Sequence, residues 1–445
     1  MNPGGPSAVR SDDPAAAGDT VRGDRDLWDE VFASQNLVTA LKRVERNRGA
    51  AGVDGVETHE LRDWCRQHWV TTRAALDAGT YRPSPVRQVM IPKPDGGQRK
   101  LGVPTVLDRL IQQAIAQVLS PVFDPGFVPV SYGFRPGKSA HDAVKVARLV
   151  IEQGYRWVVE VDLDAFFDRV NHDILISRVA RQVKDKRLLK LIRAYLEAGI
   201  MVDGVRQRAG GGTPQGSPLS PLLSNIMLDD FDQEFWGRGH RFVRYADDIR
   251  VFVKSKRAAE RVLEQSTRLL EQRLKLKVNV AKSVIAPAAT AVLLGYGFYF
   301  TSSGVRLRIA PKAWLRAKAR IRALTSRRWS VSMDYRVRRL NQYVRGWMGY
   351  FRLAHTPRKF SDLDEWYRRR LRQIRWKEWK RPRTRVANLR ALGVRADLAW
   401  QWGMSSRGYW RIAKSPILHR ALPTSYRQER GVVFFHPAWA RFRTT

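Results

Sequence analysis

The chain has 445 residues, too many for one small core, so two or three domains are expected. Lys and Arg number 80 against 42 Asp and Glu, and the resulting net charge of +38 is typical of a protein whose partner is a polyanion. A single cysteine, Cys65, excludes an internal disulfide and a cysteine-based zinc cluster, and no run of 18 apolar residues predicts a membrane span.

The excess charge is concentrated in the last third of the chain. Residues 301–445 carry 36 Lys and Arg but only 7 Asp and Glu, together with ten of the 15 tryptophans. Basic residues interleaved with aromatic ones suit phosphate contact combined with base stacking. The partner is therefore expected to be nucleic acid, and a membrane surface is a much weaker alternative.

The apolar spacing predicts alternating helices and strands. Residues 1–25 have no apolar core and are expected to form a disordered tail. In chain order, the expected elements are a helix over 26–48, a strand over 86–93 followed by a turn at 94–97, a helix over 106–119, a strand over 157–163, a long helix over 173–197, two short strands within 241–253, a helix over 258–275 and three amphipathic helices from about 312.

Two of these helices carry many arginines. An apolar stripe in the second amphipathic helix leaves Arg336, Arg338, Arg339 and Arg345 mostly outside it. In the third, the run 368–372 is expected along the outer face. Apolar stripes of this kind are expected to pack as core, so any function belongs to the charged faces.

Three aspartates are placed to bind metal. Asp162 lies on the 157–163 strand on the same face as Glu160, and Asp247 and Asp248 lie at the tip of the 241–253 hairpin. Nucleotidyl transfer needs divalent metals held by carboxylates, and Mg²⁺ prefers oxygen ligands. Carboxylates that converge without a cation repel one another, so the pattern predicts a metal site.

Eight sequence blocks in order resemble the reverse transcriptases encoded by group II introns. They are AGVDG (51–55), IPKPDGGQRKLGVP (91–104), SYGFRPGKSAHDAV (131–144), VDLDAFF (161–167), TPQGSPLSP (213–221), YADD (245–248), LKLKVNVAKS (274–283) and LGYGF (294–298). The resemblance covers roughly residues 27–436. It implies an α+β right-hand polymerase, with fingers and palm built on an antiparallel sheet, a helical thumb or maturase domain and a small C-terminal domain that binds DNA. The implied boundaries are 26–300, 301–380 and 381–445.

The resemblance also assigns roles to individual positions. Asp162, Asp247 and Asp248 are expected to bind two Mg²⁺ ions, with Mn²⁺ as a substitute. Lys93, Arg99, Gln215, Gly216 and Lys282 are expected to bind the dNTP, and Phe167 to exclude a 2′-hydroxyl, unless its ring is simply core packing. The residues expected to contact nucleic acid are Arg135, Arg338, Arg339, Arg345, Arg368, Arg369 and Arg372.

The implied partners are intron RNA, an RNA template with a DNA primer or target DNA, and dNTPs, in the bacterial cytosol. The oligomeric state cannot be predicted.

Three alternatives stay open: a splicing maturase that only binds RNA, an RNA-directed RNA polymerase and a reverse transcriptase domesticated for defence or DNA repair. The three aspartates favour an enzyme, and Phe167 argues against ribonucleotide use. His419 and His436 stand alone after residue 400, so a nuclease of the HNH type is not expected.

Overall fold

A computed structural model describes residues 26–92, 96–202, 205–207 and 216–444. The chain folds into two compact units. The first unit contains residues up to Pro125 together with His172–Leu223, and the second contains Gly126–Asn171 together with Ser224–Thr445. The described residues include no helix of the length and apolarity that crossing a membrane requires.

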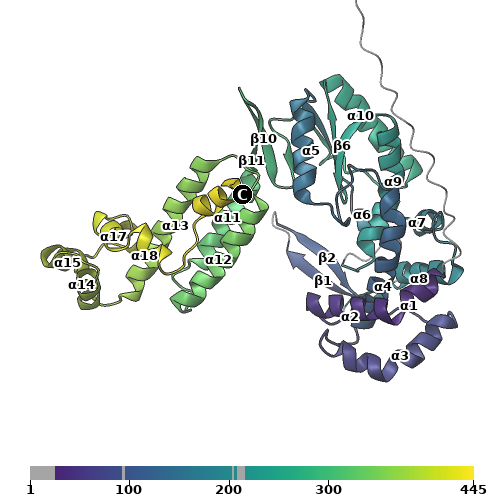
Figure 1. Cartoon of the computed structure of the whole chain (residues 1–445), viewed down its shortest axis with the longest axis horizontal. Coiled ribbons are helices and arrows are strands. Elements are labelled where there is room, and N and C mark those ends of the chain that lie inside the picture. The colour runs from purple at the N-terminus through teal and green to yellow at the C-terminus, as the bar shows by residue number, and fades with distance from the viewer. Residues whose placement is uncertain (1–25, 93–95, 203–204, 208–215, 445) are drawn as a thin grey trace, which may run out of the picture. The chain divides into compact units, whose positions relative to one another are not determined.

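The first unit combines helices with a four-stranded sheet in the order β2-β1-β4-β5 (Figure 1). The β1–β2 and β4–β5 pairs are antiparallel, whereas β1 and β4 pair in parallel. Its elements are α1 (Leu27–Phe32), α2 (Ser34–Asn47), α3 (Leu61–Asp77), β1 (Val86–Pro92), β2 (Gln98–Val103), α4 (Val106–Phe123), α7 (His172–Val179), α8 (Lys186–Glu197), β4 (Ile200–Val202) and β5 (Val205–Gln207).

Two predicted helices of this unit are each broken in two. The predicted 26–48 helix is interrupted at Ala33, whose backbone is extended. The predicted 173–197 helix ends at Val179, and α8 starts after Asp185, whose side chain accepts hydrogen bonds from the backbone N–H groups of Arg187 and Leu188. This side chain satisfies amides that would otherwise lack partners at the start of a new helix. The prediction of one long helix was therefore wrong.

The second unit is built on an antiparallel sheet in the order β6-β7-β3-β8. Its strands are β6 (Arg241–Tyr245), β7 (Asp248–Val253), β3 (Trp157–Val161) and β8 (Val284–Pro287). Helices α5 (Ala140–Glu152) and α10 (Lys256–Arg268) pack against this sheet (Figure 1). A short π-helix, η2 (Leu269–Arg273), follows α10, so the helix predicted over 258–275 changes its hydrogen-bonding pattern before its end. The remaining elements here are η1 (Asp124–Gly126), α6 (Phe166–Arg169) and α9 (Ser220–Gly237), of which η1 and α9 cross the boundary between the units.

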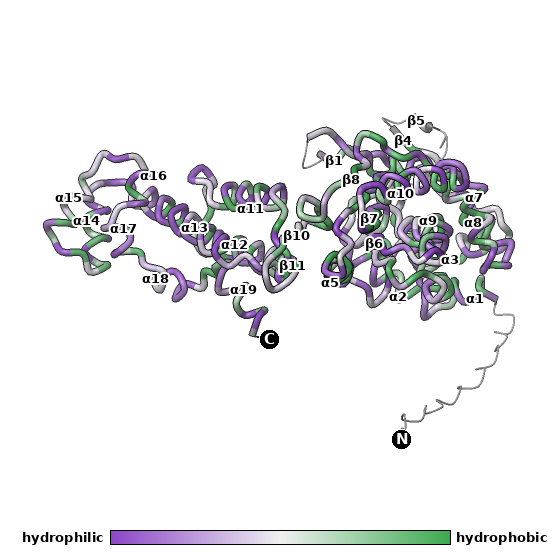
Figure 2. Tube along the Cα trace, turned by 90° about the horizontal axis from the view of Figure 1, so that it is seen from above, coloured by the Kyte–Doolittle hydropathy of each residue, from purple (hydrophilic) through white to green (hydrophobic). Residues whose placement is uncertain are grey.

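The three amphipathic helices are confirmed as α11 (Pro311–Leu324), α12 (Met333–Tyr350) and α13 (Pro357–Glu378). Green hydrophobic and purple hydrophilic residues alternate along α12 and α13 (Figure 2). Their apolar stripes share one core with α5 and with a second antiparallel sheet, ordered β11-β10-β9. Its strands are β9 (Val292–Leu293), β10 (Tyr296–Thr301) and β11 (Gly304–Ile309).

Beyond α13 the chain forms a small helical cluster and then turns back. The end of α13 packs with this cluster around Trp376 and Leu389. The last helix returns to α12 and α13, where Phe434 and Phe435 join their core. These elements are α14 (Pro382–Ala391), α15 (Ala396–Gly403), α16 (Tyr409–Ile412), α17 (Pro416–Ala421), α18 (Thr424–Gln428) and α19 (Phe435–Thr444).

Candidate active site

Adjacent strands bring two of the predicted aspartates to one edge of the β6-β7-β3-β8 sheet. Asp162 directly follows β3, whose last residue, Val161, pairs with Ile249 of β7. Asp248 is the first residue of β7 and pairs with Tyr245 across the hairpin. Asp247 is exposed in the two-residue turn that joins β6 to β7. The predicted hairpin is confirmed, although Asp248 belongs to the strand and not to the turn.

A buried network of polar side chains holds the backbone of this turn in place. Ala246 has a left-handed φ of 57°, a conformation that costs energy for a residue with a side chain. Its carbonyl oxygen accepts a hydrogen bond from Nη1 of Arg244 at 2.9 Å. Nη1 also donates to Oδ1 of Asn225 at 2.9 Å, while Nε donates to both carboxylate oxygens of Asp232 at 2.8 Å. None of these partners was predicted from the sequence.

Burial and neighbouring carboxylates both destabilise the charged forms of Asp162 and Asp248. Burial raises the pKa of Asp162 above its usual value, and the neighbouring charges of Asp247 and Asp164 add to the rise, whereas Lys282 and Arg250 oppose it. Burial likewise raises the pKa of Asp248. Arg250 forms ion pairs with Asp248 and, at 3.2 Å, with Glu160. Neighbouring carboxylates with raised pKa values form a donor set that a divalent cation would stabilise.

As they stand in the described part of the chain, no three Asp, Glu, His or Cys side chains come together closely enough to hold a metal ion. The Arg250 guanidinium occupies an oxygen of Asp248. The residue types and their electrostatics fit a metal site, but its ligands would have to draw together and Asp248 would have to exchange Arg250 for the cation.

The segment that carries Lys282 is tied to Asp162 through the backbone. The Asp162 N–H donates to Oγ of Ser283 at 3.1 Å, and the Asn279 N–H donates to the Asp162 carbonyl at 2.8 Å. The charge of Lys282 acts on the Asp162 carboxylate and opposes the rise in its pKa. The predicted contact of Lys282 with the triphosphate stays a prediction, and Ser283 was not predicted.

Phe167 lies in α6, a short helix that follows the Asp162 strand. Its ring is half-buried and meets the buried ring of Phe166 edge-on, with centroids 5.1 Å apart. Asp164, for which no catalytic role was predicted, forms an ion pair with Arg169 at 3.0 Å. A partly open ring three residues beyond Asp164 is compatible with contact to a substrate, and the role of Phe167 in sugar selection stays a prediction.

Part of the predicted dNTP-binding set lies in the first unit. Lys93 and Gln215 lie outside the described residues, and the backbone of Arg99 lies on β2, opposite Ile91. Gly216 has a φ of 115° and packs so closely on β2 that an added Cβ would lie 2.8 Å from Cδ1 of Leu101. Only glycine fits that approach without strain.

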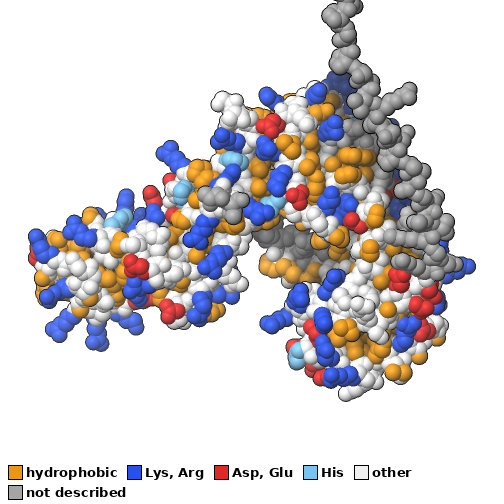
Figure 3. All heavy atoms as spheres, viewed as in Figure 1, with side chains coloured by type: hydrophobic (Ala, Val, Ile, Leu, Met, Phe, Trp, Pro, Cys, Tyr) orange, Lys and Arg blue, Asp and Glu red, His pale blue; other side chains and the backbone are white. Residues whose placement is uncertain are grey.

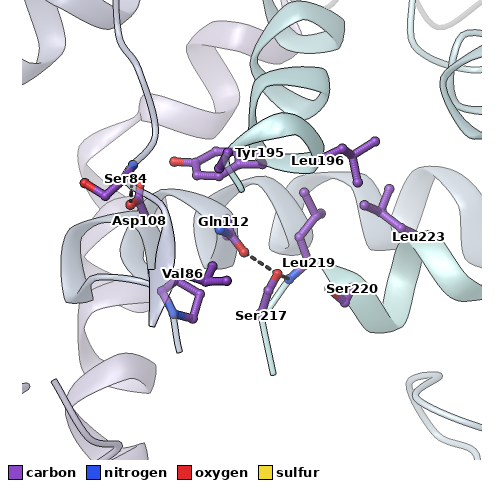
Figure 4. A pocket seen from close by; sticks show the side chains of 12 residues that line it. Ser84, Val86, Asp108, Gln112, Tyr195, Leu196, Ser217, Leu219, Ser220 and Leu223 are labelled. Atoms are coloured by element: carbon purple, nitrogen blue, oxygen red, sulfur yellow. Dashed lines mark hydrogen bonds between the residues drawn. The ribbon is translucent and has the colours of Figure 1, made fainter. Parts of the chain in front are cut away.

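The residue after Gly216 is anchored in the interior. The Ser217 hydroxyl donates to Oε1 of Gln112 on α4, and both side chains are buried (Figure 4). They line a small cavity together with Val86, Asp108 and Tyr195. Gln112 was not predicted, because nothing in its local sequence distinguishes it from other residues of an amphipathic helix.

The arginines predicted to contact nucleic acid divide into two groups. Arg338, Arg339 and Arg345 are exposed on α12, and blue Lys and Arg side chains are spread over the part of the molecule that contains this helix (Figure 3). Arg372 is only 6% exposed, and its Nε donates to the carbonyl of Ala413 at 2.7 Å, so its predicted place on the outside was wrong. The same correction applies to Arg336, which is buried and donates to backbone carbonyls of Leu324 and Trp329.

Three other predicted arginines also have partners within the protein. Arg135 donates to the carbonyls of Val128 at 2.7 Å and Ser131 at 3.0 Å, so it holds its own loop together. Arg369 stacks on Trp410 with its guanidinium carbon 3.9 Å from the ring centroid, and Arg368 lies 5.8 Å from that of Phe434. Contacts of these residues with nucleic acid stay predictions.

Comparison with known proteins identifies the architecture. Residues 91–298 match the family model described as reverse transcriptase (RNA-dependent DNA polymerase), and residues 315–393 match the one described as group II intron, maturase-specific domain. The chain is 35% identical over 289 residues to protein YkfC of Escherichia coli (strain K12), a match that covers 56% of this chain and 76% of YkfC. The chain belongs to the reverse transcriptases encoded by group II introns.

A second relative supports the same assignment over a shorter span. The group II intron-encoded protein LtrA of Lactococcus lactis subsp. cremoris is 41% identical over 160 residues, which is 36% of this chain and 26% of LtrA. The chain therefore aligns with about a quarter of that relative. In this group II intron reverse transcriptase, the edge that bears Asp162, Asp247 and Asp248 lies inside the matched reverse transcriptase region, and the exposed arginines of α12 lie inside the matched maturase region.

Proposed function

We propose that the chain is an RNA-directed DNA polymerase that extends a DNA primer with dNTPs and that also binds the RNA of its intron. The observation that carries the proposal is that adjacent strands bring Asp162, directly after β3, and Asp248, at the start of β7, to one edge of the sheet, beside Asp247 in the hairpin turn. A pair of Mg²⁺ ions bound there would activate the primer 3′-oxygen and stabilise the leaving pyrophosphate.

The predicted site residues would bind the metal ions and the nucleotide. Asp162, Asp247 and Asp248 would supply oxygen ligands, and Lys282 would neutralise triphosphate charge next to Asp162. Lys93, Arg99, Gln215 and Gly216 would bind the incoming nucleotide. The ring of Phe167 would exclude a 2′-hydroxyl and so select deoxyribonucleotides.

The parts of the chain would correspond to the fingers, palm and thumb of this polymerase family. The first unit supplies the fingers, the β3-β7 sheet supplies the palm, and α11–α13 supply the thumb, which also serves RNA splicing. The match of residues 315–393 to the maturase-specific domain supports this second activity. The basic helices beyond residue 381 would bind nucleic acid as well.

Primer extension by the purified chain tests the proposal directly. With an RNA template, a DNA primer, Mg²⁺ and all four dNTPs, the chain should synthesise DNA and should use rNTPs poorly. Phe167→Ala should then raise rNTP incorporation relative to dNTP incorporation. RNA binding without any extension would contradict the polymerase proposal and leave only the maturase role.

A further inference from the structure

The loop that precedes α5 runs in contact with the catalytic turn. The Tyr132 N–H donates to the Arg244 carbonyl at 2.9 Å, and the Arg244 N–H donates to the Val130 carbonyl at 3.1 Å, so this loop lies beside β6. At Gly133 the two backbones touch, because an added Cβ would lie 2.2 Å from the amide nitrogen of Ala246. The side chain of Asn225 fixes this contact by donating to the Gly133 carbonyl at 2.9 Å.

Phe134, the next residue, presents its ring to solvent at this point. The residue is 59% exposed, and its ring centroid lies 6.5 Å from that of Tyr245, at an interplanar angle of 42°. Its φ is +59°, a left-handed conformation that is rare and costly for an aromatic residue. Strained backbone of this kind persists only where surrounding contacts enforce it, and it clusters at functional sites.

The neighbouring Arg135 is not available in the same way. Its guanidinium donates to two carbonyls of its own loop and lies over the ring of Phe127. Phe134 therefore presents an apolar, flat ring beside the catalytic turn, whereas the guanidinium of Arg135 is engaged within the loop. A phosphate is a poor ligand for such a ring, whereas the face of a nucleobase is a good one.

We infer that Phe134 is a base-stacking residue that contacts a nucleobase of the primer–template duplex at the polymerisation site. This inference rests on the proposed function. The bound base would cover the ring that the free protein leaves in water, and the contact of Gly133 with Ala246 would set the distance between this base and the aspartates. Tyr245 would buttress the ring from the side.

The test measures the dissociation constant of an RNA template annealed to a DNA primer. Phe134→Ala should weaken binding by about 5- to 150-fold, the range for loss of one base–aromatic stack, and Phe134→Trp should retain most of the affinity. Phe134→Leu should bind like the alanine variant, because leucine keeps apolar area but has no flat face. Phe300→Ala, which removes a 39%-exposed ring from β10, is the matched control and should bind normally.

Two modified duplexes identify the base. One has an abasic site at the primer terminus, and the other has an abasic site at the templating position. If the inference holds, the difference in dissociation constant between the wild type and Phe134→Ala disappears on one of the two duplexes. The position of the abasic site in that duplex then identifies the stacked base. A difference that stays equally large on both, or no difference on the intact duplex, would overturn it.

A glycine variant separates function from folding. Phe134→Gly relieves the left-handed backbone, so its melting temperature should equal or exceed that of the wild type, while its affinity for the duplex should fall as in Phe134→Ala. A lower melting temperature with unchanged affinity would show that the ring is a packing residue. The inference fails separately from the proposed function, because a wild-type protein that extends primers and a Phe134→Ala variant that binds and extends equally well would remove only the stacking role.

Discussion

Arg244 and Asp232 form an ion pair in which neither side chain has any exposed surface. The same guanidinium donates to the carbonyl of Ala246, the residue that precedes Asp247. The pair therefore links the interior of the second unit to the geometry of the catalytic turn. Removing one partner of a buried pair leaves an uncompensated charge, whereas removing both can be close to neutral for stability.

Stability and catalysis should separate at this pair. Arg244→Met should lower the free energy of unfolding by about 3–5 kcal/mol, and Asp232→Leu combined with Arg244→Met should recover much of that loss. Nucleotide incorporation should stay slow in the double variant, because the Ala246 carbonyl still lacks its donor. Denaturant unfolding and single-turnover primer extension measure the two effects.

The surface pair between Arg238, the residue that follows α9, and Glu234 within this helix is the control for this prediction. Its side chains are 54% and 28% exposed, so Arg238→Met should change stability by less than about 1 kcal/mol. If the double variant of the buried pair recovered incorporation together with stability, the link from Arg244 to the turn would be refuted.

The hydrogen bond between Gln112 and Ser217 should hold the predicted nucleotide-binding loop in place. Gln112→Ala leaves the buried Ser217 hydroxyl without its acceptor, which costs about 1–3 kcal/mol, and frees the segment next to Gly216. We expect the KM for dNTP to rise several-fold with a smaller change in kcat. Gln113→Ala, at the adjacent and less buried position, should leave both constants unchanged, and equal effects of the two variants would argue against a positioning role.

Asp364 should make the stability of the C-terminal helix depend on pH. Its carboxylate accepts the backbone N–H groups of Phe435 and His436 at 2.8 Å, and burial raises its pKa to about 6. The folded state therefore binds the proton more tightly than the unfolded state does. As a result, the contribution of Asp364 to the free energy of unfolding falls as the pH rises from about 4 to about 6.

The matching variants isolate this effect. Asp364→Asn does not titrate, so the melting temperature of the wild type relative to this variant should fall between pH 4 and pH 6. Asp364→Ala should increase hydrogen exchange over residues 435–444. Asp362→Ala, which changes an exposed position of α13 close to Asp364, should not. A constant difference across that pH range would contradict the assignment.

The exposed arginines of α12 should determine part of the salt dependence of RNA binding. Replacing Arg338, Arg339 and Arg345 with Gln removes three potential phosphate contacts, so the slope of log affinity against log salt should become shallower by about 2–3. Arg372→Gln should instead reduce stability and leave the slope unchanged, because Arg372 binds the Ala413 carbonyl. Equal slopes for the triple variant and the wild type would place the RNA elsewhere.

Local patterns predicted the elements of the catalytic edge correctly. The 157–163 strand and the 241–253 hairpin follow from apolar residues around a short polar turn, and both are present with small shifts at their ends. The break before α8 was missed: Asp185 is a typical capping residue, but the helical apolar spacing continues on both sides of it.

Pairings between distant segments could not be predicted in this way. The pairing of Arg244 with Asp232, and of Gln112 with Ser217, depends on how whole elements pack. Arg372 was misplaced for the same reason: α16 and α19 pack on α13, so residues away from its apolar stripe are covered as well. Helical periodicity describes one buried face and does not reveal a second.

The measurement that tests the central claim most directly is Mg²⁺-dependent primer extension on an RNA template by an Asp247→Asn variant. This substitution removes a charged ligand from an exposed turn and should leave the fold and the RNA affinity nearly unchanged. We predict that it lowers the rate of nucleotide incorporation by more than about a thousandfold, a loss of roughly 4 kcal/mol of transition-state stabilisation, while Asp168→Asn, at an exposed position near Phe167, extends normally. Extension by Asp247→Asn at the wild-type rate would contradict the assignment of the three aspartates as the metal-binding catalytic residues.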